Sequence, residues 1–401
     1  MISVSHPTGN TFVRALLEEL HREEHLDLFY TTLGCGSDSI LRRPLKRRTY
    51  PIPSSKILTH SWPELQRLIS SKISFSNDRN RAPVDWIYGK LDSWVAERLS
   101  KHKTKIIHCY EDGALHTFKR AQELGIRRSY ELPIAHYETL HRLLYKEAKR
   151  WPEWEPTLLV TRETDEKLQC KDQELELADS ISCPSQFVLD SLPSCIREKK
   201  HCFVAPFGTP NSSRIQTAKS RTAKDPVRFL FVGSMSQRKG LADLFESFRN
   251  LASRQAELFV LGSPMMPMPF YREQGNFTHK PPCSHDQVLS LMASCDVLVL
   301  PSIVEGRALV QQEAMSQGLP ILVTPNAGGE DLVREEETGL LVPPSSPDIL
   351  SEKIEWFVRR KERLSAMGKA ACEHAASYKW QTYANAIISN GFSIEREARS
   401  R

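Results

Sequence analysis

The sequence predicts an α/β protein built from two domains, and three observations carry that prediction. The chain has 401 residues, more than one hydrophobic core usually holds, so two or three domains are expected. Segments with helical periodicity alternate with strand-like apolar runs, as in folds made of β-α-β units. Residues 207–226 interrupt this alternation with Gly, Pro, Asn, Ser and Thr, which is the composition of a linker.

Residues 1–206 are predicted to form the first domain. The chain opens with a strand-like run at 1–6, turns at Gly9 and continues into an amphipathic segment, so a β-α unit is expected at the start. The same alternation recurs to the end of this region. Further strands are expected at 26–31, 105–110, 129–133, 178–183 and 202–205, and helices at 12–20, 114–124, 138–150 and 165–178.

Residues 227–375 are predicted to form the second domain. It opens with the apolar strand 227–232, which is followed by a glycine-containing loop and a helix expected at 241–248. Strands and helices then alternate as far as residue 341. After Pro347 the sequence has helical character to its end.

A short segment of the second domain carries the main functional signal. The run 297–300 is apolar throughout, which is typical of a strand buried on both faces, and Pro301 ends its pairing. Ligands bind at the carboxyl edge of such sheets, because the loops diverge there and helix amides point into the crevice. Glu305 lies in this loop, ahead of a helix expected at 307–317, and Glu313 lies on that helix.

The spacing of the two glutamates suits a sugar nucleotide. Eight residues of helix span roughly 12 Å, so the carboxylates would bracket a sugar and a ribose instead of meeting at one atom. Carboxylates accept hydrogen bonds from hydroxyl groups, and free amides after Gly306 would meet phosphate oxygens. Glutamate pairs at this spacing also occur by chance on solvated helices, so the evidence lies in the connected strand, loop, helix and turn.

Several short motifs flank this segment, and together they form a recognisable pattern. They are Pro301-Ser302, Glu305-Gly306, Glu313-Ala314-Met315, Gly318-Leu319-Pro320, Gly328-Gly329, Thr338-Gly339-Leu340-Leu341-Val342, Phe231-Val232-Gly233, Arg238-Lys239-Gly240, Val260-Leu261-Gly262, Ala178-Asp179 and Pro184-Ser185. The pattern resembles the signature of family 4 of the glycosyltransferases, a retaining family with the GT-B fold. The likeness is clear over residues 155–345 and loose over the first 150 residues.

The resemblance implies the GT-B fold, in which two Rossmann-like domains face an interdomain cleft. The first domain would receive the acceptor, the second would bind the donor nucleotide, and residues 376–401 would form a helix that crosses back to the first domain and a frayed tail. The implied reaction moves a hexosyl group from a nucleoside diphosphate sugar to an acceptor hydroxyl, with retention. No metal and no cofactor are expected, because protein cations serve this fold and the sequence has no Asp-x-Asp motif.

A second group of site residues follows the strand 227–232. Gly233 ends that strand, and Arg238 and Lys239 precede the next helix, where two cations would face a phosphate at a helix terminus. The family has an arginine directly after the glycine and a lysine a few residues later. Lys239 matches the lysine, whereas Ser234 stands in place of the arginine, so Arg238 would substitute for it or the phosphate would be held less tightly.

The glutamate loop departs from the family pattern as well. The family has an aromatic residue and a glycine after Glu-Gly, where this chain has Arg307, Ala308 and Leu309. Ala308 still permits a close backbone approach to the donor. Arg307 would add a positive charge at the phosphates or face the acceptor, and amides up to Leu309 would contact the donor.

Candidates in the first domain rest on fewer residues. His136 is the best match to a histidine that faces the reacting carbon in the family, although His108 and His116 compete for the role and a lone histidine is more often structural. Glu111 and Asp112 follow a strand and would either touch the acceptor or cap the next helix. Gly9, in a loop near the expected donor phosphate, completes the set.

Composition and charge limit the partners. Residues 1–130 hold 21 Lys and Arg against 14 Asp and Glu, a net charge of +7, while the whole chain is +5. The basic runs 42–48 and 101–105 would rest on anionic lipid, receive an acidic or phosphate-bearing acceptor, or lie in solvated loops. No aromatic residues interleave these runs, which argues against nucleic acid. The acceptor is expected to be a glycan or a lipid-linked saccharide.

The sequence also bears on location. No stretch approaches about 18 apolar residues, and the first residues lack the regions of a signal peptide. A cytoplasmic protein is therefore expected, with peripheral contact at the inner membrane face as an option. The nine cysteines form no CxxC pair, which favours a reduced chain without a bound metal.

Two other functions remain open at this point. One is an enzyme of similar fold that acts on the sugar nucleotide alone, such as an epimerase; the paired glutamates and the Arg-Lys-Gly motif upstream argue against it. The other is a non-catalytic binding protein on a degenerate transferase scaffold. Ser234 and Arg307, which depart from the family pattern, keep that alternative open.

Overall fold

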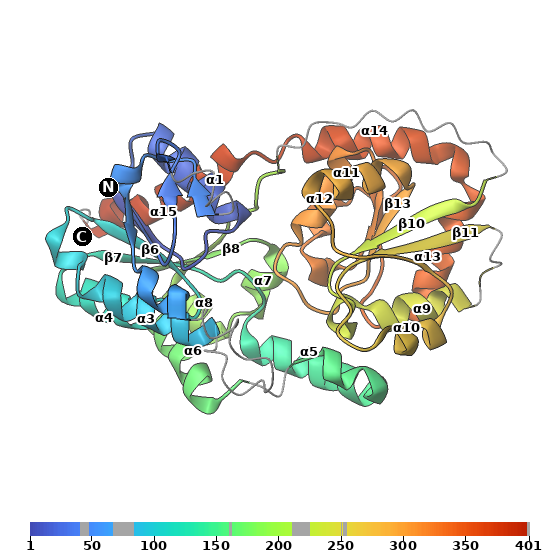
Figure 1. The fold of residues 1–401 in the computed structure, drawn as a ribbon, viewed down its shortest axis with the longest axis horizontal. Helices are drawn as coiled ribbons and strands as arrows, with labels where there is room; N and C mark the ends of the chain where they lie inside the picture. The colour runs from blue at the N-terminus through green and yellow to red at the C-terminus, as the bar shows by residue number, and fades with distance from the viewer. Residues whose placement is uncertain are drawn as a thin grey trace.

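The computed structural model describes residues 1–40, 48–66, 84–159, 163–210, 225–249, 251 and 255–398. Most of the predicted linker 207–226 and of the basic run 42–48 lies outside these residues, as do residues 399–401 of the predicted tail. Two large parallel sheets, each covered by helices, lie at opposite ends of an elongated molecule (Figure 1). The predicted α/β fold class is confirmed.

The first domain is organised around a parallel sheet of seven strands. The strand order is β5-β2-β1-β6-β7-β8-β9, so the order reverses between β1 and β6, which lie side by side at the centre. Such a reversal opens a crevice at the carboxyl edge of the sheet. The strands are β1 Ile2–Ser5, β2 Leu26–Thr31, β5 Ile57–Thr59, β6 Ile106–Tyr110, β7 Arg127–Glu131, β8 Ser180–Cys183 and β9 His201–Val204.

Helices cover both faces of this sheet, as the alternation of strand side chains requires. Ile106 belongs to the core cluster under α1 and α15 (Trp380–Ala398), while the next residue, Ile107, belongs to the cluster under α3, α4 and α6. The helices are α1 Thr11–Arg22, α3 Val84–Ala96, α4 Leu115–Glu123, α5 Tyr137–Arg150, α6 Asp165–Leu177, α7 Gln186–Ser191 and α8 Ser194–Lys199.

The second domain has a parallel sheet of six strands in the order β12-β11-β10-β13-β14-β15. Its core is one continuous cluster, in which the apolar side chains of β10 and β13 are packed between helices. The strands are β10 Val227–Val232, β11 Ala256–Leu261, β12 Thr278–Lys280, β13 Val297–Leu300, β14 Ile321–Val323 and β15 Gly339–Leu341. The helices are α9 Leu241–Arg249, α10 Met268–Gln274, α11 His285–Ser294, α12 Leu309–Ser316, α13 Pro347–Arg359 and α14 Leu364–Ala375.

Two helices connect the domains. After α14 the chain returns to the first domain as α15 (Trp380–Ala398), which lies against α1 (Figure 1). Tyr383 is fully buried there beside Phe207, and Arg127 donates a hydrogen bond to the Gly391 carbonyl at 2.7 Å. In the other direction, α5 runs from the first domain towards the second (Figure 1). The 3₁₀ turn Pro152–Thr157 that follows it places Trp154 in the second-domain core.

The predicted elements differ from the structure in detail. The helix expected at 307–317 begins only at Leu309, because the Ala308 amide bonds to the Ala327 carbonyl at 3.2 Å and holds the preceding loop extended. β7 ends at Glu131, two residues earlier than expected. The short edge strands β5 and β12 carry no long apolar run, and the sequence did not reveal them.

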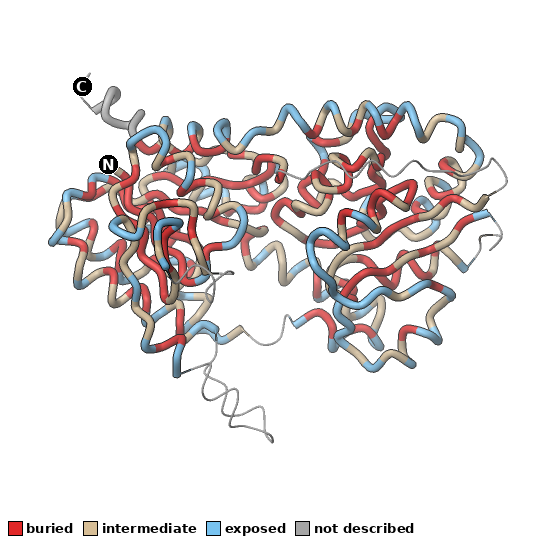
Figure 2. The backbone as a smooth tube through the Cα atoms, turned by 45° about the horizontal axis from the view of Figure 1, so that its top comes forward, coloured by how far each residue is buried: buried red, intermediate tan, exposed pale blue. Residues whose placement is uncertain are grey.

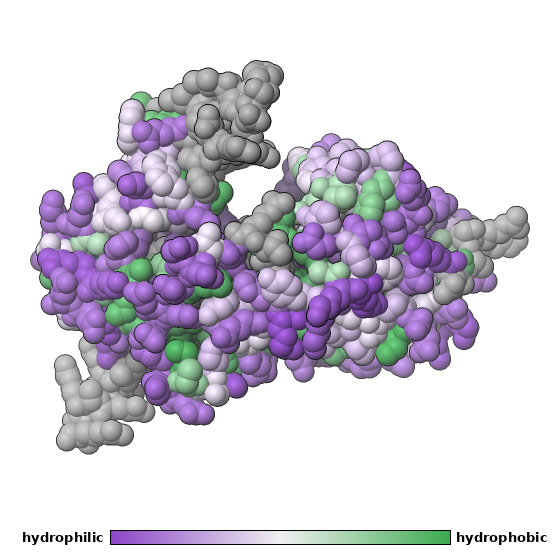
Figure 3. Space-filling view, turned by 90° about the horizontal axis from the view of Figure 1, so that it is seen from below, coloured by the Kyte–Doolittle hydropathy of each residue, from purple (hydrophilic) through white to green (hydrophobic). Residues whose placement is uncertain are grey.

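Burial and surface character follow from this architecture. Both sheets are buried and the outer helical faces are exposed (Figure 2). The face seen in Figure 3 is mainly hydrophilic, with hydrophobic side chains scattered over it. Among the described residues, no helix has the length and apolar character needed to cross a membrane.

Candidate active site

Two loops at the carboxyl edge of the second sheet form the centre of the site. One follows β10 and contains Arg238 and Lys239 in a 3₁₀ turn; the other follows β13 and contains Glu305. They are joined directly, since the Ile303 amide donates to the Arg238 carbonyl at 2.9 Å. The two loops lie next to each other because β10 and β13 are paired strands.

The side chains of these loops meet in a cluster of charges. Lys239 Nζ lies 2.7 Å from Glu305 Oε1, and Arg238 pairs with the same oxygen. Arg238 Nη1 also donates to the Val304 carbonyl at 3.3 Å. Burial lowers the pKa of Lys239, while the charge of Glu305 opposes that shift. Two cations and one carboxylate leave a positive site suited to a diphosphate.

Gly233 and Ser234 lie beside this cluster at the end of β10. The Gly233 amide donates to the Leu261 carbonyl at 3.0 Å, and the Lys239 side chain passes over Gly233, with Cε 3.5 Å from where a Cβ would be. The Ser234 hydroxyl is 3.4 Å from that of Ser236. Arg238, and not a residue at position 234, therefore provides the second cation next to Lys239.

Gly306 brings the glutamate loop against the first domain. A Cβ at this position would lie 1.7 Å from the Pro133 carbonyl oxygen, so only glycine permits the observed approach. The Gly306 carbonyl accepts a hydrogen bond from Ser185 Oγ at 2.7 Å. Beside this contact, a cavity of about 290 Å³ lies between the domains. Its lining residues are Ser185, Gln186, Phe187, Val204, Pro206, Pro325, Gly328, Glu330 and Asp331.

Arg307 does not supply the expected charge at the phosphates. Its guanidinium is buried and forms a two-oxygen ion pair with Asp331, with Nη1 to oxygen distances of 2.8 and 2.9 Å. Nε donates to Gln312 Oε1 at 3.0 Å, and the ring of Tyr378 lies 4.9 Å from the guanidinium. These partners hold the side chain inside the second domain, because a buried guanidinium requires a carboxylate and hydrogen-bond acceptors.

The next two residues have structural partners as well. The Ala308 amide is bonded to Ala327, so it is not available to a phosphate in this conformation. Leu309 packs against the apolar cluster of the first domain that includes Tyr383 and Phe207. The loop thus contributes mainly Glu305 and its fixed backbone path to the site.

Glu313 lies on α12, two turns beyond Glu305. It is half-buried, and no described residue forms a hydrogen bond or an ion pair with its carboxylate. Burial raises its pKa, and the charge of His285 on α11 counteracts this shift. With no hydrogen-bond partner among the described residues, this carboxylate is available to accept hydrogen bonds from a ligand.

His136 is located where the first domain meets the glutamate loop. The preceding residue, Ala135, packs against Ile303 and Val304. His136 Nδ1 accepts the Glu138 amide at 3.4 Å as the cap of α5, so the proton resides on Nε2, which lies 4.0 Å from Asp172 Oδ1. Burial lowers the pKa of His136 to about 4, and the ring is therefore neutral.

The competing histidines have other roles. His108 lies inside the sheet on β6, fully buried, with Nδ1 2.9 Å from the Ser129 hydroxyl. His116 lies on α4, where its amide donates to Asp92 at 2.7 Å. Neither belongs to the loops that contact Glu305, so His136 is the histidine that the structure brings to this interface.

Glu111 and Asp112 form a charged group with α6. Lys171 Nζ lies 3.6 Å from Glu111 and 3.9 Å from Asp112, and Lys167 Nζ lies 3.4 Å from Asp112. Burial raises the pKa of Glu111, while Lys171 opposes the shift. The interpretation of Asp112 as a helix cap is wrong: Glu174 accepts the Ala114 amide at 2.8 Å and the Asp112 amide at 3.0 Å.

Gly9 lies in a tight loop whose backbone amides donate hydrogen bonds to the side chain of His6, a residue of the same loop. Its φ of 55° and a Tyr50 ring carbon 2.2 Å from where a Cβ would be make glycine necessary here. The amides of Thr8 and Gly9 donate to His6 Nδ1 at 3.0 and 2.9 Å. The Gly9 amide is therefore already bonded, and its predicted contact with the donor phosphate is not supported by this conformation.

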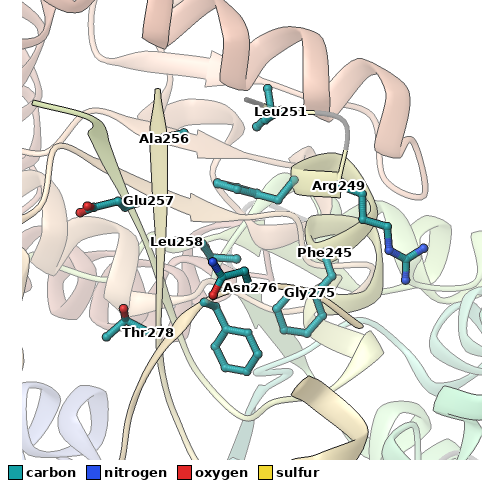
Figure 4. A pocket seen from close by; sticks show the side chains of 11 residues that line it. Phe245, Arg249, Leu251, Ala256, Glu257, Leu258, Gly275, Asn276 and Thr278 are labelled. Carbon is teal, nitrogen blue, oxygen red and sulfur yellow. The ribbon is translucent and has the colours of Figure 1, made fainter. Parts of the chain in front are cut away.

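One cavity lies apart from the site. It has a volume of about 520 Å³ and is formed by the end of α9, the first residues of β11 and the loop before β12 (Figure 4). Because it involves the amino end of β11, it lies at the opposite edge of the sheet from Glu305. Its lining residues are Phe245, Phe248, Arg249, Leu251, Ala256, Glu257, Leu258, Gly275, Asn276, Phe277 and Thr278.

Comparison with known families identifies the second domain. Residues 212–374 match the family described as glycosyl transferases group 1, and this region contains both loops of the charge cluster. The second domain is similar to the domains of this family. The resemblance inferred from the motifs is thus confirmed at the level of this family.

Relatives in sequence agree with this assignment. The chain is 28% identical over 185 residues to a D-inositol 3-phosphate glycosyltransferase of Paenarthrobacter aurescens, covering 43% of this chain and 45% of that protein. It is 24% identical over 289 residues to the Corynebacterium efficiens protein of the same name, covering 66% of each chain. In the first of these alignments, the chain spans less than half of the length of the Paenarthrobacter relative.

Solved structures establish the fold of the whole chain. Sucrose-phosphate synthase from Thermosynechococcus elongatus superimposes with a TM-score of 0.67 at 19% identity, covering 100% of this chain and 99% of that one. The Anabaena protein HepE, in complex with UDP-glucose, superimposes with a TM-score of 0.61 at 15% identity, covering 97% and 98%. The GT-B fold predicted from the sequence is confirmed.

Structure adds residues that the sequence did not single out. Gln237 precedes the two cations and is fully buried, with hydrogen bonds to Glu147 and Asp243. Asn326 donates to the Ile303 carbonyl of the glutamate loop, which Ser185, a residue of the sequence motifs, also holds through the Gly306 carbonyl. Gln237 adjoins the Arg-Lys motif, and this is the only signal that could have drawn attention to it.

Proposed function

We propose that this chain is a retaining glycosyltransferase of family 4, which moves a hexosyl group from a nucleoside diphosphate sugar to an acceptor hydroxyl. The observation that carries the proposal is the meeting of Arg238, Lys239 and Glu305 at the carboxyl edge of the second sheet. These groups match the charge distribution of the donor, since cations attract its diphosphate and a carboxylate accepts bonds from its sugar hydroxyls.

Donor binding exchanges partners within the cluster. Without a ligand, Glu305 neutralises part of the charge of Arg238 and Lys239. An incoming diphosphate takes over these two cations and releases the Glu305 carboxylate, which then binds sugar hydroxyls. Glu313 on α12 has no described partner and accepts the ribose hydroxyls.

Transfer then occurs on one face of the sugar. The bond between the anomeric carbon and the diphosphate oxygen breaks, and a bond from the acceptor oxygen to the same carbon forms. The acceptor's proton passes to the departing phosphate oxygen. Lys239 and Arg238 stabilise the negative charge that grows on the leaving group, which is the electrostatic contribution that usually dominates such reactions.

The first domain supplies the acceptor side of the reaction. His136 approaches the glutamate loop through Ala135 and faces the reacting carbon, while Glu111 and Asp112 bind acceptor hydroxyls. The acceptor is a glycan or a lipid-linked saccharide, and the basic N-terminal part permits peripheral contact with an anionic inner membrane face in a cytoplasmic protein. Because Arg238 and Lys239 carry the charge, neither a metal nor a cofactor is required.

The test is a thermal-shift screen of the purified protein against UDP-, GDP- and ADP-linked hexoses. A ligand at about 100 times its dissociation constant stabilises a protein by roughly 2.7 kcal/mol. One donor class should raise the unfolding temperature of the wild type, and Lys239→Ala and Glu313→Ala should abolish that shift. Lys369→Ala, at an exposed position of α14, should retain it. A folded wild type that responds to none of these donors contradicts the proposal.

A non-catalytic binding protein is the second candidate, favoured by Ser234 at the position of the family arginine and by the inward side chain of Arg307. Release of free hexose from the bound donor in the absence of acceptor separates the two functions. A binding protein releases hexose no faster than the uncatalysed reaction, whereas a transferase hydrolyses the donor slowly but measurably faster. Analysis of the released sugar also excludes an epimerase, which would change its configuration.

A further inference from the structure

An arm of the first domain contacts the phosphate-binding loop of the second. This interdomain arm, residues 137–158, consists of α5 and the 3₁₀ turn after it (Figure 1). At its far end Trp154 is fully buried among second-domain aromatics, with ring centroids 5.0 Å from Phe270 and 5.6 Å from Tyr271. Arg150 forms an ion pair with Asp243 on α9, at 2.5 Å. The far end of the arm is thus part of the second-domain core.

Glu147 is the buried charge of this arm. Its side chain is 2% exposed, although it precedes the second domain by 80 residues of sequence. One carboxylate oxygen accepts Gln237 Nε2 at 2.7 Å, and the other accepts Ser345 Oγ at 2.5 Å. Arg150 Nη1 lies 3.2 Å from Glu147 Oε2, the oxygen that accepts the hydrogen bond from Gln237. A buried carboxylate with this set of partners fixes the donors that surround it.

Gln237 links Glu147 to the turn that carries Arg238 and Lys239. Its Oε1 accepts the Ala242 amide at 2.8 Å, and its Nε2 donates to Asp243 at 3.0 Å. Its own amide donates to Thr157 Oγ1, at the end of the arm, at 3.1 Å. Arg238 and Lys239 follow immediately in the same 3₁₀ turn, so the arm determines the path of the backbone from which both cations project.

We propose that Glu147 is a positioning residue for the donor diphosphate: through Gln237 it holds the Arg238-Lys239 turn in the geometry that binds phosphate. The inference rests on the proposed function, because it concerns the same site. It adds that the first domain takes part in donor binding.

The primary variant is Glu147→Ala, with Asp92→Ala as the matched control. Asp92 is also a buried carboxylate, 3% exposed, that accepts backbone amides, but its partners are His116 and Thr117 on α4. Glu147→Ala should weaken UDP binding, measured by calorimetry, by about 10-fold. Glu147→Gln retains an acceptor for Gln237 and should restore affinity to within about 3-fold of the wild type. Asp92→Ala should leave UDP affinity unchanged.

Hydrogen–deuterium exchange provides a readout that needs no ligand. In Glu147→Ala the amides of Gln237 and Ala242 should exchange about 10-fold faster, while β10 stays protected. Unchanged exchange there, or equal acceleration in Asp92→Ala, overturns the inference. So does unchanged UDP affinity in folded Glu147→Ala. If the wild type binds no UDP, the proposed donor site fails for that nucleotide, and the exchange experiment still decides whether the arm controls the loop.

Discussion

The two sheets of this protein bury different kinds of side chain. In the second domain β13 (Val297–Leu300) is apolar and buried throughout, and the charged groups gather at the edge of the sheet. In the first domain the central strands bury polar residues, including Ser3 on β1, His108 on β6 and Glu131 on β7. One sheet is an apolar support for charges outside it, whereas the other contains ionisable groups in its interior.

The buried groups of the first domain are kept neutral. Burial lowers the pKa of His108 to about 3 and raises that of Glu131 to about 8, and their nearest ring nitrogen and carboxylate oxygen are 3.9 Å apart. Ser182 donates a hydrogen bond to Glu131, which reduces the cost of its burial. We therefore expect the buried groups in the interior of the first sheet to make its stability depend on pH.

The largest expected effect is on the apolar sheet. Leu298→Ala, in the fully buried strand β13, should lower the free energy of unfolding by about 2–5 kcal/mol, because it removes packed methyl groups and leaves a cavity. Ser129→Ala, in the first sheet, should cost only about 1 kcal/mol, the usual value of one hydrogen bond. Scanning calorimetry of both variants measures the difference. Equal losses of unfolding free energy in the two variants would contradict the proposed difference between the sheets.

The second effect separates the roles of the domains in catalysis. Glu305→Gln should reduce kcat about 100-fold, since the sugar hydroxyls lose an anionic acceptor. It should also strengthen UDP binding, because Arg238 and Lys239 lose their internal counter-ion. His136→Ala should reduce kcat and leave UDP affinity unchanged. Steady-state kinetics and calorimetry test both; weaker UDP binding in Glu305→Gln would contradict the exchange of partners.

The third effect concerns pH. Glu131 is protonated in the fold below about pH 8 and ionised in the unfolded chain above its ordinary pKa, so unfolding releases a proton between these values. Stability should therefore fall as the pH rises from about 5 to 8, by at most about 1.4 kcal/mol per unit from this group. His108, with a lowered pKa, acts in the opposite sense: its contribution is lost as the pH falls below about 6.5.

Glu131→Gln provides the test of this pH dependence. The amide has the shape of the protonated acid and does not titrate, so the variant should lose the decrease in unfolding temperature between pH 6 and pH 8. Asp296→Asn, at a buried carboxylate of the second domain, serves as the control and should keep it. An unaltered profile in Glu131→Gln would show that another group is responsible.

The sequence predicted more of the second domain than of the first, because local patterns set the former and contacts between distant segments set much of the latter. Apolar runs and glycine turns have a strict spacing, so β10, β13 and β14 and the residues Glu305, Glu313 and Lys239 could be placed from the sequence. Glu111 and Asp112 could not be assigned partners, since these lie on α6, more than 50 residues away. The inward turn of Arg307 depends likewise on Asp331, which no local pattern links to it.

The sequence by itself determined the fold class, the family of the second domain and the loops that carry its charges. These features depend on local periodicity and on motifs of adjacent residues. Only the tertiary structure decided that Glu305 pairs with both cations, that Gly9 bonds to His6, and that Glu147 contacts Gln237. Such contacts arise when distant segments are packed together, and the energy of burying a polar group, not the sequence spacing, selects its partner.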